Sequence, residues 1–112
     1  MSPFVVGIDQ GTTATKAYRL SADGDFQQLC SIEHRQLYPQ PGWVEHSPRE
    51  LLASVEHCLD RAGSAVGAGL DNQGETVIAW DADSGEAVHN AIVWQDNRTQ
   101  DVTNRLKAEG AE

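Results

Sequence analysis

The stretch Phe4–Lys16, with the sequence FVVGIDQGTTATK, most constrains what this chain can fold into. It begins with an unbroken apolar run, Phe4–Ile8, which is typical of a strand buried on both faces. Asp9 places a carboxylate at the end of that strand, and Gly11 begins a turn of small residues. A second β-prone stretch, Ala14–Leu20, follows the turn. The pattern predicts two strands joined by a tight glycine turn.

The turn carries the chemical groups that bind phosphate. A glycine lets backbone N–H groups approach an anion closely, because no Cβ intervenes. The hydroxyls of Thr12 and Thr13 add donors, and the carboxylate of Asp9 can hold a hydrated Mg²⁺. These residues predict a phosphate-binding hairpin. An ordinary hairpin with an aspartate on its surface fits the same pattern, so the turn alone leaves both interpretations open.

Length and composition limit the classes of protein to consider. A chain of 112 residues forms one domain at most. Its formal net charge of −9, from 17 acidic and 8 basic residues, argues against nucleic acid and anionic membranes as partners. No apolar stretch approaches the ~20 residues of a membrane span, and no export signal precedes the first strand. We expect a cytoplasmic protein in which Cys30 and Cys58 are reduced thiols.

The next segments predict an antiparallel meander followed by a helix. Phe26–Gln36 is expected to form the third strand of the meander. The loop Tyr38–His46 contains two prolines, which exclude helix and disfavour the interior of a sheet. Ser47 can cap the helix, with a proline at the first helical position and Glu50 completing a capping box. Gly63 is a natural C-terminal stop.

The chain after this helix predicts a β-α-β arrangement. Ala65–Leu70 is short, small and apolar, and it suits a buried strand. Residues 71–76 follow it directly, and polar side chains at the end of a buried strand are typical of ligand sites in α/β sheets. Val77–Asp81 and Val88–Trp94 predict a hairpin, and Gln95–Ala108 predicts a helix. The four histidines and two cysteines have no spacing that indicates a transition-metal site.

Three separated segments resemble the FGGY family of carbohydrate kinases, with glycerol kinases as the nearest members. They are VGIDQGTTATK at Val6–Lys16, YPQPGWVEHSP at Tyr38–Pro48 and DNQGETVIAWDADSGEAVHNAIVWQDNRT at Asp71–Thr99. The resemblance implies an α/β fold of the actin-like, ribonuclease H-like class. It also implies that residues 1–112 are the N-terminal portion of the first such domain of a sugar or polyol kinase. The domain is then incomplete, with a three-strand meander, a helix, a parallel strand, a hairpin and a helix.

The family transfers the γ-phosphoryl group of ATP to a hydroxyl of a polyol or sugar with Mg²⁺, so the resemblance implies these cofactors and substrates here. Asp9 matches the family aspartate near the metal, and Thr12 and Thr13 match the threonines that meet the transferred phosphate. Glu75 matches the glutamate that hydrogen-bonds a polyol hydroxyl, and Trp94 matches a tryptophan of the polyol pocket. The residues expected to bind the cofactor are Asp9, Gln10, Gly11, Thr12, Thr13 and Lys16. Those expected to bind the substrate are Gly74, Glu75 and Trp94.

The chain departs from the family pattern at Ala14, where serine is often found, and in three further places. Lys16 stands where arginine is usual, and a lysine is a point charge without the two-pronged guanidinium, which predicts a weaker phosphate contact. Gly74 replaces an arginine that supplies several donors to neighbouring hydroxyls, so we expect a different or larger polyol than glycerol. The connector Gly63–Ser64 is shorter than usual, which indicates either a deletion or a missing loop.

The resemblance places the catalytic aspartate, the base for the acceptor hydroxyl, beyond residue 112. We therefore expect no catalytic base and no kinase activity in these 112 residues alone. A truncated sheet leaves an edge and an apolar face uncovered, which predicts self-association into a homo-oligomer. Two alternatives stay open. One is an actin-like or Hsp70-like ATPase domain, which shares the Asp-x-Gly-Thr hairpin, and the other is a non-catalytic interaction module that docks through the hairpin 77–94.

Overall fold

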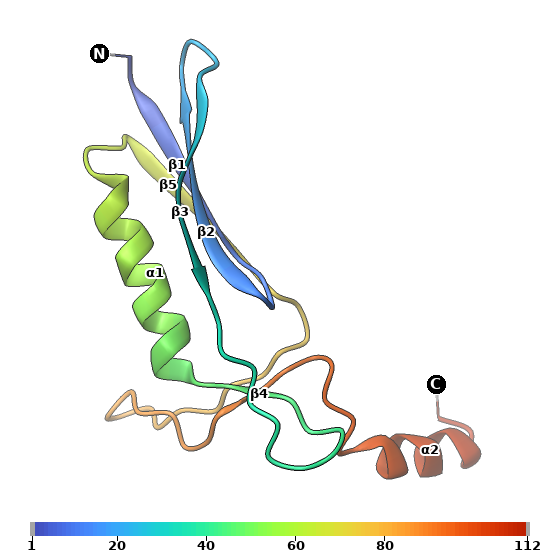
Figure 1. Ribbon diagram of the computed structural model, residues 1–112. Coiled ribbons are helices and arrows are strands. Elements are labelled where there is room, and N and C mark those ends of the chain that lie inside the picture. Colours follow the sequence, from blue (N-terminus) through green and yellow to red (C-terminus); the bar gives the residue numbers. More distant parts are fainter. Residues whose placement is uncertain (1, 112) are drawn as a thin grey trace.

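The computed structural model describes residues 2–111. The molecule is elongated, with extents of 60 × 32 × 27 Å and a radius of gyration of 17.9 Å, against about 13 Å for a compact chain of this length. Figure 1 shows a sheet flanked by one helix, loops at one end of the sheet, and a second helix that extends away. The elements are, in order, β1 (Phe4–Gln10), β2 (Ala14–Ser21), β3 (Phe26–Glu33), β4 (Glu45–His46), α1 (Pro48–Ala62), β5 (Gly67–Asn72), β6 (Ala91–Ile92) and α2 (Gln100–Ala108).

Four strands form the main sheet in the order β3-β2-β1-β5. β1, β2 and β3 pair antiparallel, which confirms the predicted meander. β5 lies parallel to β1, as the β-α-β pattern predicted. The register sets Asp9 of β1 beside Lys16 of β2 on one side and beside Asp71 of β5 on the other. The turn between β1 and β2, for which phosphate binding is predicted and which is called the phosphate turn below, therefore lies at the same end of the sheet as the polar residues after β5.

α1 covers one face of this sheet and forms the core with it (Figure 1). The side chains buried in this core are Val6, Ile8, Ala17, Cys58 and Ala62. The predicted N-cap is confirmed, since the hydroxyl of Ser47 accepts from the backbone N–H of Glu50 at 3.4 Å. The predicted stop is also confirmed, because the helix ends at Gly63, whose φ of 60° favours glycine.

The structure corrects three details of these predictions. Glu50 does not complete the capping box, because its carboxylate accepts from the backbone N–H and the guanidinium of Arg35. β1 is buried on one face only, with Val6 1% exposed and Val5 44% exposed. The segment Ala65–Leu70 contributes to β5, which is an edge strand with all of its residues exposed. In each strand the apolar run was compatible with burial, but within residues 2–111 no element covers the second face.

The loops at the end of the sheet contain a second, two-stranded sheet. β4 and β6 pair antiparallel in it, so the segment predicted as a loop at Tyr38–His46 ends as a short strand. The predicted hairpin 77–94 is held by isolated bridges and not by two continuous strands. Ile92 lies between two partners, Val77 on one side and Glu45 on the other.

An ion-pair cluster fixes the path of the chain between β6 and α2. The guanidinium of Arg98 donates to Asp96 at 2.7 Å and to Glu45 at 2.8 Å, and it lies 3.9 Å from the ring centroid of Trp43. Asp96 also accepts from the backbone N–H of Val44 at 2.7 Å. The side chains of both carboxylates are almost fully buried, so each of these bonds is shielded from water.

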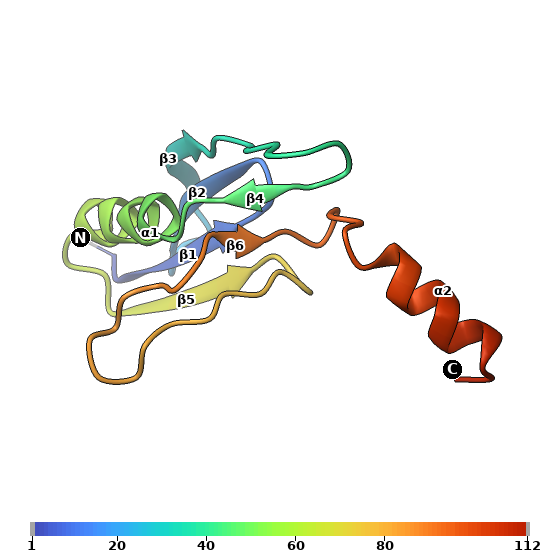
Figure 2. The ribbon, with the colours of Figure 1, turned by 90° about the horizontal axis from the view of Figure 1, so that it is seen from below.

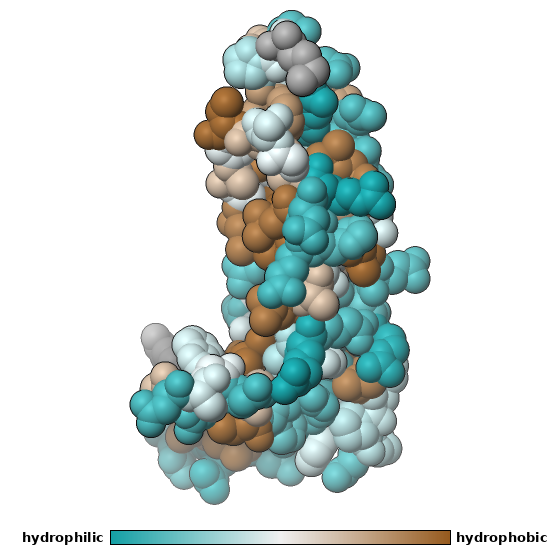
Figure 3. All heavy atoms as spheres, turned by 90° about the vertical axis from the view of Figure 1, so that its left-hand side faces the viewer, coloured by the Kyte–Doolittle hydropathy of each residue, from teal (hydrophilic) through white to brown (hydrophobic). Residues whose placement is uncertain are grey.

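α2 begins at Gln100, later than the predicted start at Gln95, because residues 96–98 are held in the ion-pair cluster. It projects from the body in two perpendicular views and buries none of its residues (Figures 1 and 2). On the side that carries α1, apolar side chains interrupt a mostly polar surface (Figure 3), and Leu52 and Leu59 of α1 are exposed. Over residues 2–111, every helix is too short or too polar to traverse a membrane.

Candidate functional site

The turn between β1 and β2 lines a hollow of about 380 Å³. Its lining residues are Asp9, Gly11, Thr12, Thr13, Ala14, Lys16, Ser31 and Glu33. The N–H of Gly11 donates to the carbonyl of Ala14 at 2.9 Å and closes the turn. The N–H groups of Thr12 and Thr13 donate to no protein atom within residues 2–111. Two consecutive free N–H groups beside a lysine suit an anion such as phosphate.

A second hollow of about 480 Å³ adjoins the first. The two share Asp9, Gly11 and Thr12. The end of β5, the loop after it and the segment after β6 supply the other lining residues of the second hollow, which are Asp71, Asn72, Gln73, Gly74, Glu75 and Trp94. The two hollows therefore meet at the phosphate turn, and groups bound in them are neighbours.

Glu75 has a strained backbone at the wall of the second hollow. Its φ of 63° makes it the one non-glycine residue with a left-handed backbone in the described chain, residues 2–111. Such a conformation costs about 1–3 kcal/mol and is concentrated at ligand sites. The preceding residue, Gly74, faces open space, since a Cβ built there would meet no atom within 4 Å. The wall at 74–75 therefore has room for a ligand or for a larger side chain.

Trp94 is held over the turn by two hydrogen bonds, one from its side chain and one from its backbone. Its indole N–H donates to Oγ1 of Thr12 at 2.8 Å, and its backbone N–H donates to Oγ1 of Thr76 at 3.2 Å. The hydroxyls of Thr12 and Thr76 donate in turn to Oε1 of Gln73, at 3.3 and 2.9 Å. Trp94 remains 51% exposed, so its ring surface is available to a ligand in the second hollow.

Two neighbouring histidines are buried next to the second hollow, and one of them, His46, contacts its lining residue Gln73. His34 and His46 are 7% and 1% exposed, with ring centroids 5.7 Å apart. Burial lowers the pKa of both imidazoles. A charge on His34 lowers the pKa of His46 further, and the carboxylate of Glu50 opposes both shifts. Both rings are therefore neutral near neutral pH.

A magnesium ion at this site has few protein ligands to use. In the described part of the chain, no group of three or more His, Cys, Asp or Glu side chains is placed to hold a metal ion. Asp9 is exposed and lines both hollows, and Asp71 lies beside it on β5. Mg²⁺ is commonly held by one or two carboxylates, with waters and substrate phosphates as its other ligands. The position of Asp9 fits this mode of binding.

The structure brings most of the predicted site residues together. Those that line the two hollows are Asp9, Gly11, Thr12, Thr13, Lys16, Gly74, Glu75 and Trp94. Gln10 lines neither hollow, because its amide donates to Oγ1 of Thr15 at 3.1 Å and to the carbonyl of Leu51 at 2.9 Å. Sequence reasoning missed Gln73 and His46 as individual members of the site. The polar run after β5 indicated the region of Gln73, and the matched segment Tyr38–Pro48 contained His46 without assigning it a role.

A larger hollow of about 650 Å³ lies between the start of α1 and the segment 77–94. Its lining includes Trp80 and Val88, and an exposed ion pair between Arg49 and Glu86, 2.7 Å long, is part of it. It contains neither the phosphate turn nor Asp9. We therefore assign the functional site by its chemical groups and not by size.

Comparison with known proteins places the chain among carbohydrate kinases. Residues 4–112 match the family model for the FGGY family of carbohydrate kinases, N-terminal domain. The glycerol kinase of Oleidesulfovibrio alaskensis is 45% identical over 118 residues, covering 98% of this chain and 24% of that protein. The glycerol kinase of Symbiobacterium thermophilum is 47% identical, covering 96% of this chain and 23% of that protein. The chain thus spans about a quarter of the length of these curated relatives.

Solved structures share the same backbone arrangement. A glycerol kinase from Plasmodium falciparum, solved with ADP, superposes with a TM-score of 0.81 at 29% identity and covers 96% of this chain and 23% of its own. A xylulose kinase from Lactobacillus acidophilus superposes with a TM-score of 0.86, and at 23% identity it supports the fold alone; the match covers 96% of this chain and 23% of the xylulose kinase. The predicted α/β class, actin-like and ribonuclease H-like, is confirmed by these neighbours.

Proposed function

The chain belongs to the FGGY family of carbohydrate kinases, and we propose that its adjoining hollows hold the terminal phosphate of ATP and a hydroxyl of a polyol or sugar. The observation that carries this proposal is that both hollows are lined by Asp9, Gly11 and Thr12. Phosphoryl transfer depends on holding donor and acceptor in contact while their charge is compensated. A turn shared by two hollows supports that arrangement.

On the donor side, the free N–H groups of Thr12 and Thr13 and the ammonium group of Lys16 contact phosphate oxygens. Asp9 is the residue that would hold Mg²⁺, and the bound ion supplies positive charge against those oxygens. The hydroxyl of Thr13 is a further donor. The ADP in the P. falciparum glycerol kinase supports the use of a nucleotide.

On the acceptor side, the carboxylate of Glu75 accepts from substrate hydroxyls, and the ring of Trp94 packs against substrate carbon atoms. The curated glycerol kinases at 45% and 47% identity support an acceptor with several hydroxyls. The open space at Gly74 supports an acceptor larger than glycerol. Its identity among polyols and sugars is the finer part of this proposal.

We further propose that these 112 residues alone do not catalyse the transfer. Asp9, Thr13, Glu75 and Trp94 are all exposed, so the two hollows form one side of an enclosed site. Alignment of the reactants from both sides and exclusion of water supply much of the rate in such reactions. The assignment to the first of two ribonuclease H-like domains, and of the base to a residue beyond 112, remains a prediction.

The family match favours a kinase over the actin-like or Hsp70-like ATPase alternative. The alternative of a docking module predicts a protein partner whose binding is independent of ATP and Mg²⁺. Cys30 and Cys58 are free thiols with sulfur atoms 3.3 Å apart, and we propose that they stay reduced in the cytoplasm.

The test is an assay that couples ADP release to a spectroscopic readout, run on the full-length protein with ATP, Mg²⁺ and a panel of polyols and sugars. We expect acceptor-dependent ADP release from the full-length protein and none from the 112-residue chain. Acceptor-independent hydrolysis would indicate an ATPase, and the absence of ADP release with every acceptor would contradict the kinase. Turnover by the purified 112-residue chain, abolished in Asp9→Ala, would contradict its predicted inactivity.

A further inference from the structure

The hydrogen bonds that hold Thr12 form a closed ring beside the phosphate turn. The ring leaves Thr12 through its hydroxyl, runs through Gln73, His46 and Gln36, and returns to the backbone carbonyl of Thr12. We propose that these three are positioning residues, which fix the direction of the Thr12 hydroxyl proton and so hold the phosphate turn against Trp94. The inference rests on the proposed function of the turn.

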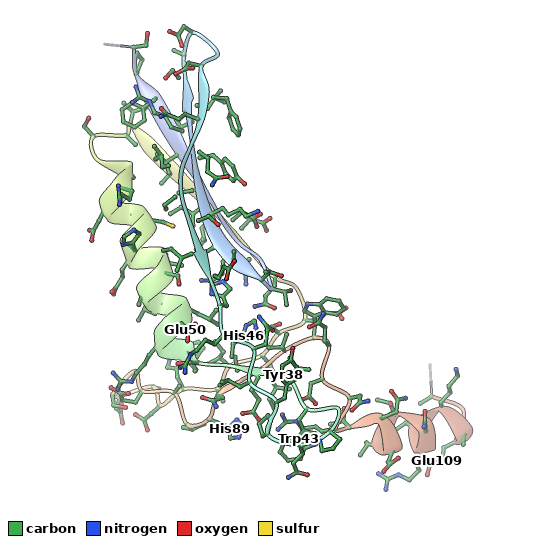
Figure 4. All side chains as sticks on the ribbon, in the orientation of Figure 1. Tyr38, Trp43, His46, Glu50, His89 and Glu109 are labelled. Atoms are coloured by element: carbon green, nitrogen blue, oxygen red, sulfur yellow. The ribbon has the colours of Figure 1, made fainter. Side chains whose placement is uncertain are left out.

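Each link of the ring joins two specific atoms. Oε1 of Gln73 accepts from the hydroxyl of Thr12 at 3.3 Å, and Nε2 of Gln73 donates to Nδ1 of His46 at 3.3 Å. Nε2 of His46 donates to Oε1 of Gln36 at 2.8 Å, and Nε2 of Gln36 donates to the carbonyl of Thr12 at 3.0 Å. Figure 4 shows His46 in the interior of the molecule, between the end of the sheet and the loops.

The direction of every proton follows from groups that can act in one way only. The carbonyl of Thr12 only accepts, so Gln36 turns its amide N–H to that oxygen and its Oε1 to His46. His46 must then carry its proton on Nε2, which leaves Nδ1 as the acceptor for the amide N–H of Gln73. Oε1 of Gln73 is left for the hydroxyl proton of Thr12. The indole N–H of Trp94 can only donate, so it donates to the oxygen of the same hydroxyl.

This arrangement gives the Thr12 side chain a role different from phosphate binding. Its proton is used by Gln73, so the phosphate is met by the free backbone N–H groups of Thr12 and Thr13. Gln73 also accepts from Thr76, whose Oγ1 accepts from the backbone N–H of Trp94. Loss of the Gln73 amide therefore removes the acceptor that orients both hydroxyls bonded to Trp94, so Trp94 is held less firmly over the turn.

The ring requires a neutral His46. This side chain is 1% exposed, and the ionisable groups that face it are His34, after β3, and Glu50 of α1. Burial, and then the charge of His34, lower the pKa of His46, while Glu50 raises it. A proton added to Nδ1 would point at the amide N–H of Gln73, which is also a donor. Protonation of His46 therefore opens the ring.

The variant Gln73→Glu reverses this requirement. A carboxylate at position 73 still accepts from Thr12 but cannot donate to Nδ1 of His46, so it favours the doubly protonated imidazole that the wild-type ring excludes. We would follow His46 by NMR in full-length protein labelled with ¹⁵N-histidine. We expect the neutral Nε2–H form in the wild type near neutral pH, and a titration midpoint higher by at least about one pH unit in Gln73→Glu. Gln27→Glu, the same change at an exposed position of β3, leaves the midpoint unchanged.

Kinetics distinguish positioning from mere packing. In Gln73→Glu we expect kcat to fall by about 10- to 100-fold at mildly alkaline pH and to recover as the pH is lowered. The KM for ATP stays within about three-fold of the wild type. In the wild type, kcat falls over the same acidic range. A uniform loss of activity at every pH, together with unchanged titration of His46, would indicate packing alone and overturn the proposal.

A second pair of variants guards against misfolding of Gln73→Glu. Thr12→Val removes the hydroxyl at a partly exposed position and shifts the indole N–H resonance of Trp94, whereas Thr12→Ser preserves it. The hydrogen-bonded ring would be contradicted if His46 carried its proton on Nδ1. It would also be contradicted if the indole N–H resonance of Trp94 did not shift in Thr12→Val. The NMR measurements do not depend on turnover. If the wild-type protein released no ADP, the proposed function would be contradicted, but the NMR measurements would still test the hydrogen-bonded ring.

Discussion

The indole N–H of Trp94 donates to the hydroxyl of Thr12 at 2.8 Å and joins segments 82 residues apart. This bond sets the wall of the second hollow, where we propose that the acceptor binds, directly on the turn between β1 and β2. Trp94→Phe keeps an aromatic ring and removes the donor, so we expect KM for the acceptor to rise about five-fold, as for a hydrogen bond of ~1 kcal/mol. Steady-state kinetics of the full-length protein measure it. Trp80→Phe, outside both hollows, is the control, and an equal rise in that variant would contradict the assignment.

Asp9 is predicted to be the residue whose charge matters most for turnover. Asp9→Asn keeps the shape of the side chain but weakens the attraction for Mg²⁺, and we expect kcat to fall by about 10²- to 10³-fold. Asp71→Asn, on the neighbouring strand, tests whether a second carboxylate contributes. Asp60→Asn on the exposed side of α1 is the control for charge. Full activity of Asp9→Asn at saturating Mg²⁺ would contradict the metal role.

Much of the fold follows from local sequence, because its determinants lie within a few residues of each other. Ser47, Pro48 and Gly63 begin and end α1 where they were expected to. The meander follows from three β-prone runs separated by short turns. The burial of β5 was predicted wrongly. The small residues of Ala65–Leu70 show that the segment is apolar, but they do not show whether another element packs against it.

The site was predictable in part for a related reason. Asp9, Glu75 and Trp94 were identified through matched motifs, and the structure lines one hollow with all three. The links of His46 in β4 to Gln36 and Gln73 are contacts between segments far apart in the sequence. No period or spacing in the chain encodes such contacts, since they depend on how β4, β6 and the end of β5 meet.

Gly74 is predicted to set the choice of acceptor. A Cβ at this position would meet no atom within 4 Å, so the arginine of Gly74→Arg starts in open space beside Glu75. The added guanidinium supplies donors to substrate hydroxyls, and we expect kcat/KM for glycerol to rise about ten-fold relative to larger polyols. Competition assays with paired acceptors measure this ratio. Ser64→Arg adds the same charge far from the hollows, and a matching change in that variant would contradict a local effect.

Asp96 is predicted to make stability depend on pH in the acidic range. The bonds from Arg98 lower the pKa of its carboxyl from the ordinary 3.8 to about 2. The unfolded chain therefore takes up a proton first as the pH falls, so the stabilisation is complete above about pH 4 and is lost towards about pH 2. Asp96→Asn should lower the melting temperature at neutral pH by about 5–10 °C and flatten this dependence. Thermal unfolding at several pH values measures both, and an equally steep curve in the variant would refute the assignment.

The face of the sheet opposite α1 is predicted to drive self-association of the 112-residue chain. Val5, Leu20 and Phe26 are 44%, 46% and 63% exposed, and the strand register sets them side by side on this face. Exposed apolar surface next to an open strand edge favours association between chains. We expect the mass measured by light scattering to rise with concentration, and Leu20→Lys to suppress the rise. Leu52→Lys, at an exposed position of α1 on the other side of the sheet, should leave it unchanged. A monomer at every concentration, or equal suppression by both variants, would contradict a role for this face.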